Sequence, residues 1–333
     1  MKKIMFRGKE VGGMDDNAQK LIVDKLWGDF DETSDFPAKR PLLAHYTSID
    51  TFEKIVSNDE LWLSNPLFMN DLEELRFGMN QGSKHFNSSS ALSDAFQDKS
   101  RYHYLVECFN KFFSNYEVNH VFDTYLTCFS EHDVSDYDGR LSMWRGYGNS
   151  GNGVALVIDT SKINYAKGSP LIIAKVNYAS TDSRVQWINE KILEVANIAR
   201  NIKHNDGNLK ALAHYWFERL KIFALCTKHS GFSEEQEWRL VYMSERDETG
   251  ILKDKLSYAI SANGVEPKLK LKIEHIPGII SENVSLSDLT ERIILGPSIS
   301  SILAEKSVVR ILEILGQNQL CKLVSPSGIP FRP

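Results

Sequence analysis

The sequence predicts an α+β fold, in which strands and helices are mixed along one chain. Short apolar runs typical of strands recur between residues 42 and 324. Apolar side chains at three- and four-residue spacing predict two long helices over residues 182–227. These elements do not alternate as regular strand–helix–strand units, so a doubly wound parallel sheet is disfavoured.

The size and composition are those of an ordinary globular protein. The 333 residues suit one elaborated domain or two fused ones, and 42% apolar residues provide for a full core. The net charge of −5 does not indicate a nucleic-acid-binding protein, although a local basic stripe is compatible with it. No run approaches the ~18 apolar residues of a membrane span. The four cysteines form no CxxC pair, which favours reduced thiols. We therefore expect a cytoplasmic protein without a membrane segment.

The chain divides into an N-terminal arm and one large domain. Residues 1–40 are predicted to form the arm, with one helix where apolar residues fall at helical spacing between Ala18 and Trp27. Residues 41–333 are predicted to form the domain. It is expected to carry helical insertions near residues 80–118 and 182–227.

The domain begins with strand-like and helix-starting signals in close succession. Residues 42–47 are predicted to form a short apolar strand, and Ser48 suits the N-cap of the helix that follows. A second strand is expected at residues 61–64. Asn70 and Asp71 then precede another amphipathic stretch. Both residue types are favoured as N-caps, so a capped helix is predicted to begin there.

The middle of the chain alternates polar and apolar segments. Residues 80–100 are rich in Ser, Asn, Gln and Asp, so a loop or irregular insert is predicted there, followed by a helix over residues 101–118. Strands are expected at residues 124–130, 154–159 and 171–178. The second of these is the clearest buried strand, because it is continuously apolar.

The C-terminal third is predicted to complete the sheet and to close with a helix. Apolar runs indicate strands at residues 256–260, 269–273 and 293–295. A closing helix is expected over residues 298–315, and residues 322–324 suit a short last strand.

A pair of acidic residues opens a further strongly β-forming run. Glu235 and Glu237 are two residues apart, so on a strand both carboxylates share one face, and Trp238, Leu240 and Tyr242 share the other. The alternative is that both acids are solvated at a loop-to-strand boundary, as most charged residues are. Exposed sheet edges carry Lys more often than paired acids. This favours a site in which positive charge develops during bond cleavage.

Two further segments carry polar or aromatic side chains at strand ends. His45 is positioned to hold a ribose hydroxyl, with Thr47 on the same face; the alternative is a half-buried histidine with one hydrogen bond. In the segment from Ser142 to Tyr147, the tyrosine offers a ring for a flat ligand, or else the segment is an aromatic turn that packs on the core. The glycines that follow precede a strand rather than a helix, which excludes a Rossmann phosphate loop.

Two charged patterns have a stronger structural than functional interpretation. Lys268, Lys270 and Lys272 alternate with apolar residues, which favours the solvent side of a half-buried strand over an acceptor-binding stripe. The aspartates between Asp133 and Asp138 lack a suitably spaced histidine and carboxylate set, so no metal site is expected.

Taken in order, these segments resemble the His–Tyr–Glu signature of the ADP-ribosyltransferase superfamily. The resemblance rests on His45-x-Thr47 after a strand, Ser142 to Tyr147 before a buried strand, and Glu237 at the start of a later strand. The run from His45 to Ile49 is also similar to the opening of DNA-modifying bacterial ADP-ribosylating toxins.

The chain further resembles a bacterial family of formerly unknown function found among defence and toxin genes. The shared features are Asn70-Asp71, Met143-Trp144 with Tyr147, and Glu235-x-Glu237-Trp238-Arg239. Together the two resemblances cover roughly residues 42–300, through short motifs. The spacing of Ser142 and Tyr147 is wider than in the eukaryotic enzymes, and Tyr46 is the alternative to Tyr147.

The resemblance implies a split mixed β-sheet of the ADP-ribosyltransferase type with helical insertions, and NAD⁺ as the substrate. Glu237 would accept a hydrogen bond from a ribose hydroxyl and stabilise an oxocarbenium-like transition state. Glu235 would orient or deprotonate the acceptor. His45 would hold the adenosine-side ribose, supported by Thr47 and Ser142, and Tyr147 or Tyr46 would stack on nicotinamide. No metal is required.

The implied function is a bacterial toxin or anti-phage effector that transfers ADP-ribose to RNA, DNA or protein. An inhibitor protein that acts as antitoxin is the further partner that such a role implies. Two alternatives use the same sequence features. One is NAD⁺ hydrolysis with water as the acceptor, and the other is a non-catalytic domain that senses a nucleotide or a phage protein.

Overall fold

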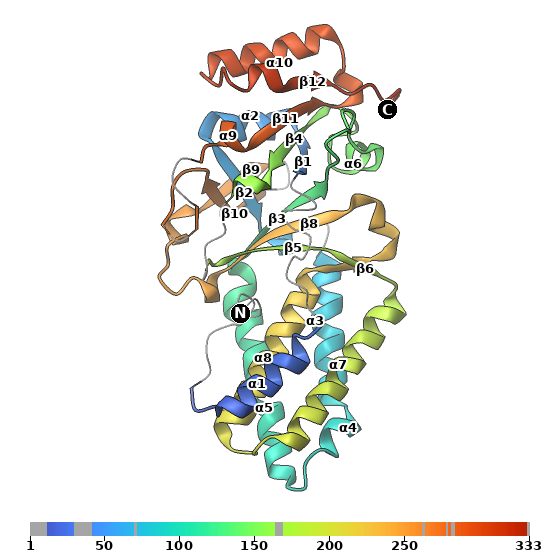
Figure 1. Cartoon of the computed structure of the whole chain (residues 1–333), viewed down its shortest axis with the longest axis vertical. Helices are drawn as coiled ribbons and strands as arrows, with labels where there is room; N and C mark the ends of the chain where they lie inside the picture. The colour runs from blue at the N-terminus through green and yellow to red at the C-terminus, as the bar shows by residue number, and fades with distance from the viewer. Residues whose placement is uncertain are drawn as a thin grey trace.

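A computed structural model shows the predicted α+β fold, with a mixed sheet in the upper part of Figure 1 and a helical bundle below it. It describes residues 12–29, 42–69, 72–163, 169–261, 264–277, 279–280 and 284–331. The Asn70-Asp71 pair that contributes to the resemblance lies outside these residues.

The described residues include a ten-stranded sheet in which the strand order does not follow the sequence. The path runs β12-β11-β4-β1-β3-β2-β10-β9, and β8 pairs with both β3 and β5. Neighbouring strands are antiparallel except β11 and β12, which are parallel. The strands are β1 (Leu42–Ser48), β2 (Glu60–Ser64), β3 (Thr124–Glu131), β4 (Gly153–Asp159), β5 (Leu171–Lys175), β8 (Glu237–Met243), β9 (Leu256–Ser261), β10 (Gly264–Lys272), β11 (Thr290–Leu295) and β12 (Val324–Pro326).

The sheet splits between β1 and β3. Strand β1 pairs with β4 from Leu42 to Ser48, but with β3 it pairs only at Leu43 and Ala44. Strand β3 pairs with β8 from Thr124 to Ser130, but beyond Ala44 it has no further pairing with β1. The two halves of the sheet therefore diverge after Ala44, and the side chain of the next residue, His45, faces the gap between them.

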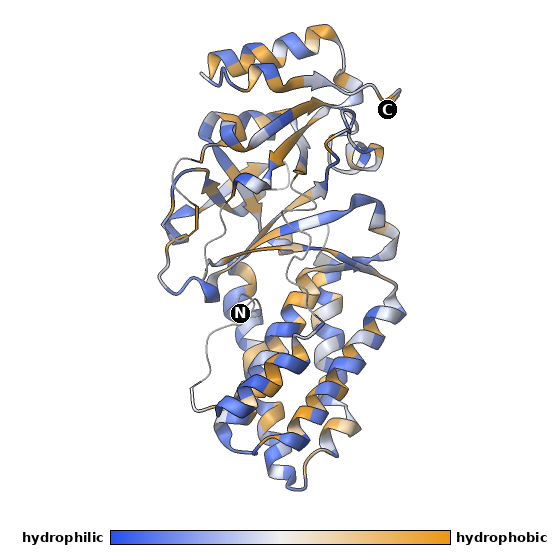
Figure 2. Cartoon of the chain, viewed as in Figure 1, coloured by the Kyte–Doolittle hydropathy of each residue, from blue (hydrophilic) through white to orange (hydrophobic). Residues whose placement is uncertain are grey.

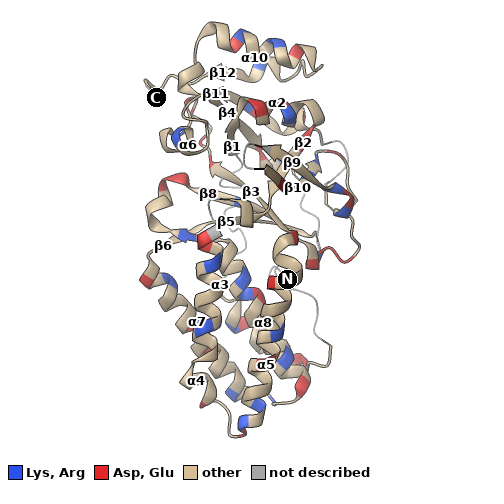
Figure 3. Ribbon diagram, turned by 180° about the vertical axis from the view of Figure 1, so that it is seen from behind, with Lys and Arg blue, Asp and Glu red and all other residues tan. Residues whose placement is uncertain are grey.

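Among the residues that the structure describes, six helices form the bundle (Figure 1): α1 (Asp16–Leu26), α3 (Leu72–Asn87), α4 (Ser90–Ser93), α5 (Lys99–Asn115), α7 (Thr181–Asn201) and α8 (Asp206–Leu225). Helix α8 is buried on nearly every side, as expected for a helix surrounded by others. Helix α1, from the predicted N-terminal arm, packs against α7 and α8 through Ile22, Val23 and Leu26. Figures 2 and 3 show hydrophilic and charged residues, of both signs, on the outer helices.

The prediction of a loop over residues 80–100 is wrong, because most of this segment is helical. Helix α3 continues to Asn87, α4 covers Ser90–Ser93, and α5 begins at Lys99. Its few apolar side chains, including Phe86 and Leu92, are buried in the bundle core, while the polar ones face outward. Tertiary burial of a narrow apolar face therefore outweighs the low average hydrophobicity of the segment.

Two shorter segments also differ from prediction. Residues 171–178 form two strands, β5 and then β6 (Asn177–Ala179), which pairs in parallel with β7 (Thr227–His229) in a separate small sheet. The segment before Tyr147 is a helix, α6 (Leu141–Gly146), and not an aromatic turn.

Strand β8 separates the two main hydrophobic cores, so both of its faces are buried. Trp238 and Tyr242 contribute to the core of the sheet region, and Leu240 packs against it, which confirms the predicted shared face. Val241 and Met243 point to the bundle core on the other side. The residues at the start of β8 therefore sit where the sheet, the bundle and the split meet.

The remaining helices cover the sheet. They are α2 (Ile49–Asn58), α9 (Leu286–Leu289) and α10 (Ile302–Ile314). Ser48 caps α2 through its hydroxyl, which accepts from the backbone N–H of Thr51 at 3.1 Å, as predicted. This cap ends β1 and fixes the direction in which the chain leaves the split.

Close packing of α3 on α8 depends on glycine at position 78, and its loss is expected to destabilise the protein. A Cβ at Gly78 would lie 2.7 Å from the Cβ and 2.8 Å from the Cα of Ala224. Helix propensity alone favours Gly78→Ala by ~1 kcal/mol, but overpacking costs ~1–3 kcal/mol. Urea denaturation should show a lower free energy of unfolding than in the wild type.

Gly146→Ala is the matched control, because a Cβ at this helical position meets nothing within 4 Å. It should leave the free energy of unfolding unchanged or raise it. Equal effects of the two substitutions would contradict the packing explanation.

Candidate functional site

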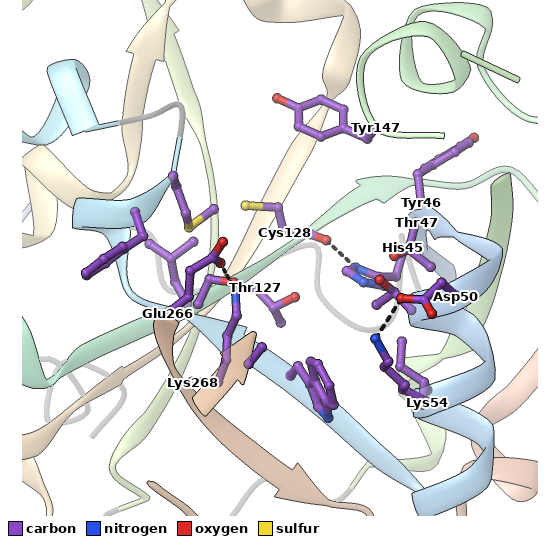
Figure 4. A pocket seen from close by; sticks show the side chains of 18 of the residues that line it. His45, Tyr46, Thr47, Asp50, Lys54, Thr127, Cys128, Tyr147, Glu266 and Lys268 are labelled. Carbon is purple, nitrogen blue, oxygen red and sulfur yellow. Dashed lines mark hydrogen bonds and ion pairs between the residues drawn. The ribbon is translucent and has the colours of Figure 1, made fainter. Parts of the chain in front are cut away.

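A pocket of about 620 Å³ opens at the split in the sheet. His45, Tyr46, Thr47, Tyr147, Glu235 and Glu237 are among the residues that line it, so it brings together six of the seven predicted site residues. Ser142 is not among them and lies half-buried on α6. Figure 4 shows the pocket with His45 and Cys128 near its centre and Tyr147 at one side.

His45 bridges the two diverging halves of the sheet. Its Nδ1 lies 2.9 Å from the backbone carbonyl oxygen of Cys128 on β3. A carbonyl only accepts, so Nδ1 carries the proton and Nε2 is the acceptor nitrogen. Burial lowers the pKa of His45 below its usual value, which keeps the ring neutral at pH 7. A neutral imidazole with an acceptor nitrogen suits a ligand hydroxyl.

Tyr46 borders the pocket, but its ring and hydroxyl point away from His45, as strand alternation requires (Figure 4). Its hydroxyl accepts a hydrogen bond from the backbone N–H of Arg140 at 2.8 Å, and its ring meets Trp144 edge-on, with ring centroids 4.8 Å apart. Burial raises the pKa of Tyr46 to about 12. This packing contradicts the alternative in which Tyr46 stacks on a ligand. Thr47 is buried and lines the pocket.

The two acidic residues converge, but not because they share a strand face. Glu235 ends a 3₁₀ helix (Ser230–Glu235), and Gln236 adopts a left-handed conformation with φ 42° and ψ 53°. The strand begins only at Glu237. The predicted reason for convergence is therefore wrong: a backbone turn at Gln236, and not the alternation of a strand, directs both carboxylates to one cation.

That cation is Lys228, on β7. Its Nζ lies 2.7 Å from Oε2 of Glu235 and 3.2 Å from Oε2 of Glu237. Arg239 donates from Nε to Oε1 of Glu237 at 2.7 Å, and from Nη1 to the carbonyl of Leu225 at 2.6 Å. All four charged side chains are at most 10% exposed. Two cations thus balance two carboxylates in a buried cluster, as buried charges require.

The environment pushes the pKa values of the two carboxyl groups in opposite directions. Burial raises the pKa of Glu235, and the nearby Glu237 adds to this, against the pull of Lys228. For Glu237 burial also opposes ionisation, but the adjacent Arg239 and Lys228 outweigh it and hold its pKa at about 2. Glu237 is therefore a permanent negative charge, and Glu235 is the group poised to exchange a proton.

Tyr147 follows α6 directly and reaches into this cluster. Its hydroxyl donates to Oε1 of Glu235 at 2.9 Å, and its side chain is 37% exposed. Helix α6 is anchored beneath it by the fully buried Trp144, whose indole N–H donates to the carbonyl of Asp138 at 2.9 Å. Tyr147 thus combines a fixed hydroxyl with an accessible ring at the edge of the pocket.

Lysines line the pocket across from Tyr147 (Figure 4). Lys268 is 12% exposed and contacts Oε2 of Glu266 at 2.9 Å and the hydroxyl of Ser64 at 2.8 Å. This corrects the preferred solvent-side interpretation of Lys268. Lys54 pairs with Asp50 at 2.7 Å. The pocket thus has the two carboxylates of Glu235 and Glu237 at one end and two lysine–carboxylate pairs at the other.

Sequence reasoning missed Lys228 and the ion-pair role of Arg239. Arg239 was visible only as part of the acidic strand motif. No sequence pattern indicated Lys228, because it lies in a strand of only three residues directly after a helix, and lysines are usually exposed. Cys128, which contacts both His45 through its carbonyl and Glu237 through its thiol, was likewise seen only as a buried strand residue.

Three further properties bear on the chemistry available to the described residues. They contain no group of three or more His, Cys, Asp or Glu side chains that could hold a metal ion. Within the same residues, no helix combines the length and the apolar character needed to cross a bilayer. All four cysteines are free thiols.

The match to known proteins covers part of the chain. Residues 143–240 match the model of a family described as a protein of unknown function, DUF2971. The matched segment contains Tyr147, Lys228, Glu235, Glu237 and Arg239. No curated protein and no solved structure matches the chain significantly.

Proposed function

We propose that the protein is an NAD-dependent ADP-ribosyltransferase. The observation that carries this proposal is the buried Glu235–Glu237 pair, with pKa values moved apart, at one end of a pocket that also holds the neutral His45 and two lysine–carboxylate pairs. NAD⁺ presents groups that suit this lining. Its nicotinamide ribose becomes positive during cleavage, and its pyrophosphate is negative.

The proposed reaction breaks the bond between C1′ of the ribose and the nicotinamide nitrogen. Nicotinamide leaves with the bonding electron pair, and positive charge develops on the ribose. Glu237, ionised at neutral pH, stabilises that charge from within hydrogen-bonding reach of a ribose hydroxyl. A lone pair of the acceptor then forms the new bond to C1′, and the acceptor proton passes to Glu235.

The remaining pocket residues fit the rest of the substrate. Nε2 of His45 accepts from a hydroxyl of the second ribose, near the hydroxyl of Thr47. The ammonium groups of Lys54 and Lys268 exchange their partners Asp50 and Glu266 for the pyrophosphate oxygens when the substrate binds. The partly exposed ring of Tyr147 lies against the nicotinamide side, where its hydroxyl already bonds Glu235. The role of Ser142 as a polar support has no contact in its favour, since Ser142 does not line the pocket.

The acceptor proposed is a macromolecule, nucleic acid or protein, which would make the protein a cytoplasmic toxin or anti-phage effector. An inhibitor protein would then be a second partner. The test is incubation of the purified protein with NAD⁺ labelled in its adenylate phosphate, alone and with a cell lysate. Label on RNA, DNA or protein supports transfer, and free ADP-ribose alone identifies hydrolysis. Absence of nicotinamide release in both mixtures would refute the enzymatic proposal and leave a sensing role.

Glu235→Gln should separate cleavage from transfer. If Glu235 takes the acceptor proton, its loss lowers label transfer by about 10²-fold or more, while slow release of nicotinamide to water continues. In the wild type, transfer should rise with pH through the raised pKa of Glu235, because the base must be deprotonated. The readouts are labelled product and free nicotinamide over a pH series. Equal losses in both readouts would contradict the assignment.

A further inference from the structure

Lys228 contacts both carboxylates of the site, and its side chain is only 2% exposed. Besides Glu235 and Glu237, its Nζ lies 3.4 Å from the hydroxyl of Tyr147 and over the ring of Phe232. A buried ammonium group is stable only when it is paired with negative charge. The ion pairs therefore restrain Lys228 as well as the two carboxylates.

The backbone places Lys228 at the end of the bundle, in the strand that leads into the acidic turn. Helix α8 ends at Leu225, and Lys228 follows within β7, where it is the register partner of Tyr178 on β6. The adjacent Asn177 donates its N–H to the carbonyl of Cys226 at 2.8 Å. The ammonium group is therefore placed by the junction of bundle and small sheet.

The acidic turn is tied to β6, since the backbone N–H of Glu237 donates to the hydroxyl of Tyr178 at 2.9 Å, and it has further contacts outside the bundle. The hydroxyl of Ser130 on β3 donates to the carbonyl of Glu235 at 2.6 Å. Arg140 donates from Nη2 to the side-chain oxygen of Gln236 at 2.6 Å. Lys228 is thus the point at which the bundle and the sheet meet at the two carboxylates.

Two ionised carboxylates in one buried site repel each other, and one takes up a proton unless a cation lies between them. The groups that face the pair are Arg239 on β8, Lys228 on β7, Cys128 on β3, Tyr178 on β6, Tyr147 after α6 and Cys226 after α8. Burial raises the pKa of Tyr178 to about 12 and that of Cys226 to about 11, so neither contributes a charge at pH 7. Arg239 forms an ion pair with Glu237, whereas Lys228 forms ion pairs with both Glu235 and Glu237.

We propose that Lys228 is a positioning residue that holds Glu235 and Glu237 together as a charged pair, which leaves Glu235 able to take the acceptor proton. This inference rests on the function proposed above. Lys228 acts through the carboxylates and does not itself contact the reacting atoms. It therefore sets the lowest pH at which the site is active.

The test compares the wild type with Lys228→Met and Lys228→Arg. Without the cation, the pair should share a proton at neutral pH. The acidic limb of the pH profile for label transfer from NAD⁺ should then move up by at least about one pH unit, and the arginine variant should restore it. Infrared spectroscopy at pH 7 should show a protonated carboxyl band in Lys228→Met that is absent when Glu235→Gln is added.

Lys221→Met is the matched control. Lys221 is fully buried and also bridges two carboxylates, Glu218 at 2.6 Å and Glu245, but it lies in the bundle. Its loss should lower stability without moving the acidic limb. Should circular dichroism show that Lys228→Met is unfolded, Lys228→Gln is measured in the same way.

An unmoved acidic limb in a folded variant, with no band that depends on Glu235, would overturn the positioning role. If the wild type releases no nicotinamide, the proposed function fails on its own. The infrared comparison still decides whether Lys228 holds a charged pair.

Discussion

Glu237→Gln is expected to lower kcat for nicotinamide release from NAD⁺ by at least about 10²-fold, the scale found when one preorganised electrostatic contact is removed. The substitution nearly preserves the shape of the side chain but removes the charge that the adjacent Arg239 and Lys228 keep ionised. The amide cannot stabilise the positive charge that develops on the ribose. Steady-state assay of released nicotinamide at saturating NAD⁺ measures the effect.

Glu218→Gln provides the matched control. Glu218 is 2% exposed, pairs with Lys221 and Arg246, and has a pKa that these cations hold at about 2, although burial opposes ionisation. It lies in the bundle, so its substitution should reduce stability but leave kcat unchanged. Comparable kcat for Glu237→Gln and the wild type would remove Glu237 from the mechanism, and an equal loss in Glu218→Gln would show that the effect is one of stability.

Arg239→Met is expected to reduce the free energy of unfolding by ~3–5 kcal/mol, the usual cost of removing one partner from a buried ion pair. Arg239 is 2% exposed and bonds both Glu237 and the carbonyl of Leu225 at the end of α8. Methionine fills similar volume but leaves a carboxylate with one cation fewer and a carbonyl without this donor. Urea denaturation followed by circular dichroism measures the change.

Arg76→Met tests whether the loss depends on burial. Arg76 pairs with Glu73 on the surface, with side chains 58% and 83% exposed, so its removal should change the free energy of unfolding by less than ~0.5 kcal/mol. A loss at Arg239 no larger than that at Arg76 would mean that the contacts of Arg239 with Glu237 and with the carbonyl of Leu225 do not hold β8 to the bundle.

Most of the sheet and the two long helices were predictable because each depends on a local pattern. The continuous apolar run of β4 and the helical spacing of α7 and α8 are properties of neighbouring residues. The segment over residues 80–100 was not predictable in this way. Its apolar positions are few, and only the burial of Phe86 and Leu92 against distant helices makes the helical form stable.

The candidate site shows the same division. Residue types and their order indicated His45, Tyr147, Glu235 and Glu237, which do line one pocket. The left-handed turn at Gln236 was not visible, since a non-glycine residue in that conformation is held by its surroundings and not by its own preference. The prediction that the two carboxylates converge was therefore correct. The turn at Gln236, and not strand alternation, brings them together.

The sequence by itself determined the fold class, the order of most strands along the chain and the acidic pair at the start of β8. Only the tertiary structure decided which cations meet that pair, that Tyr46 turns away from the pocket, and that Lys268 lines it. The physical reason is the range of each interaction. Hydrophobic periodicity is set by residues that are neighbours in the chain, whereas a buried ion pair needs the path of the whole chain to bring its partners together.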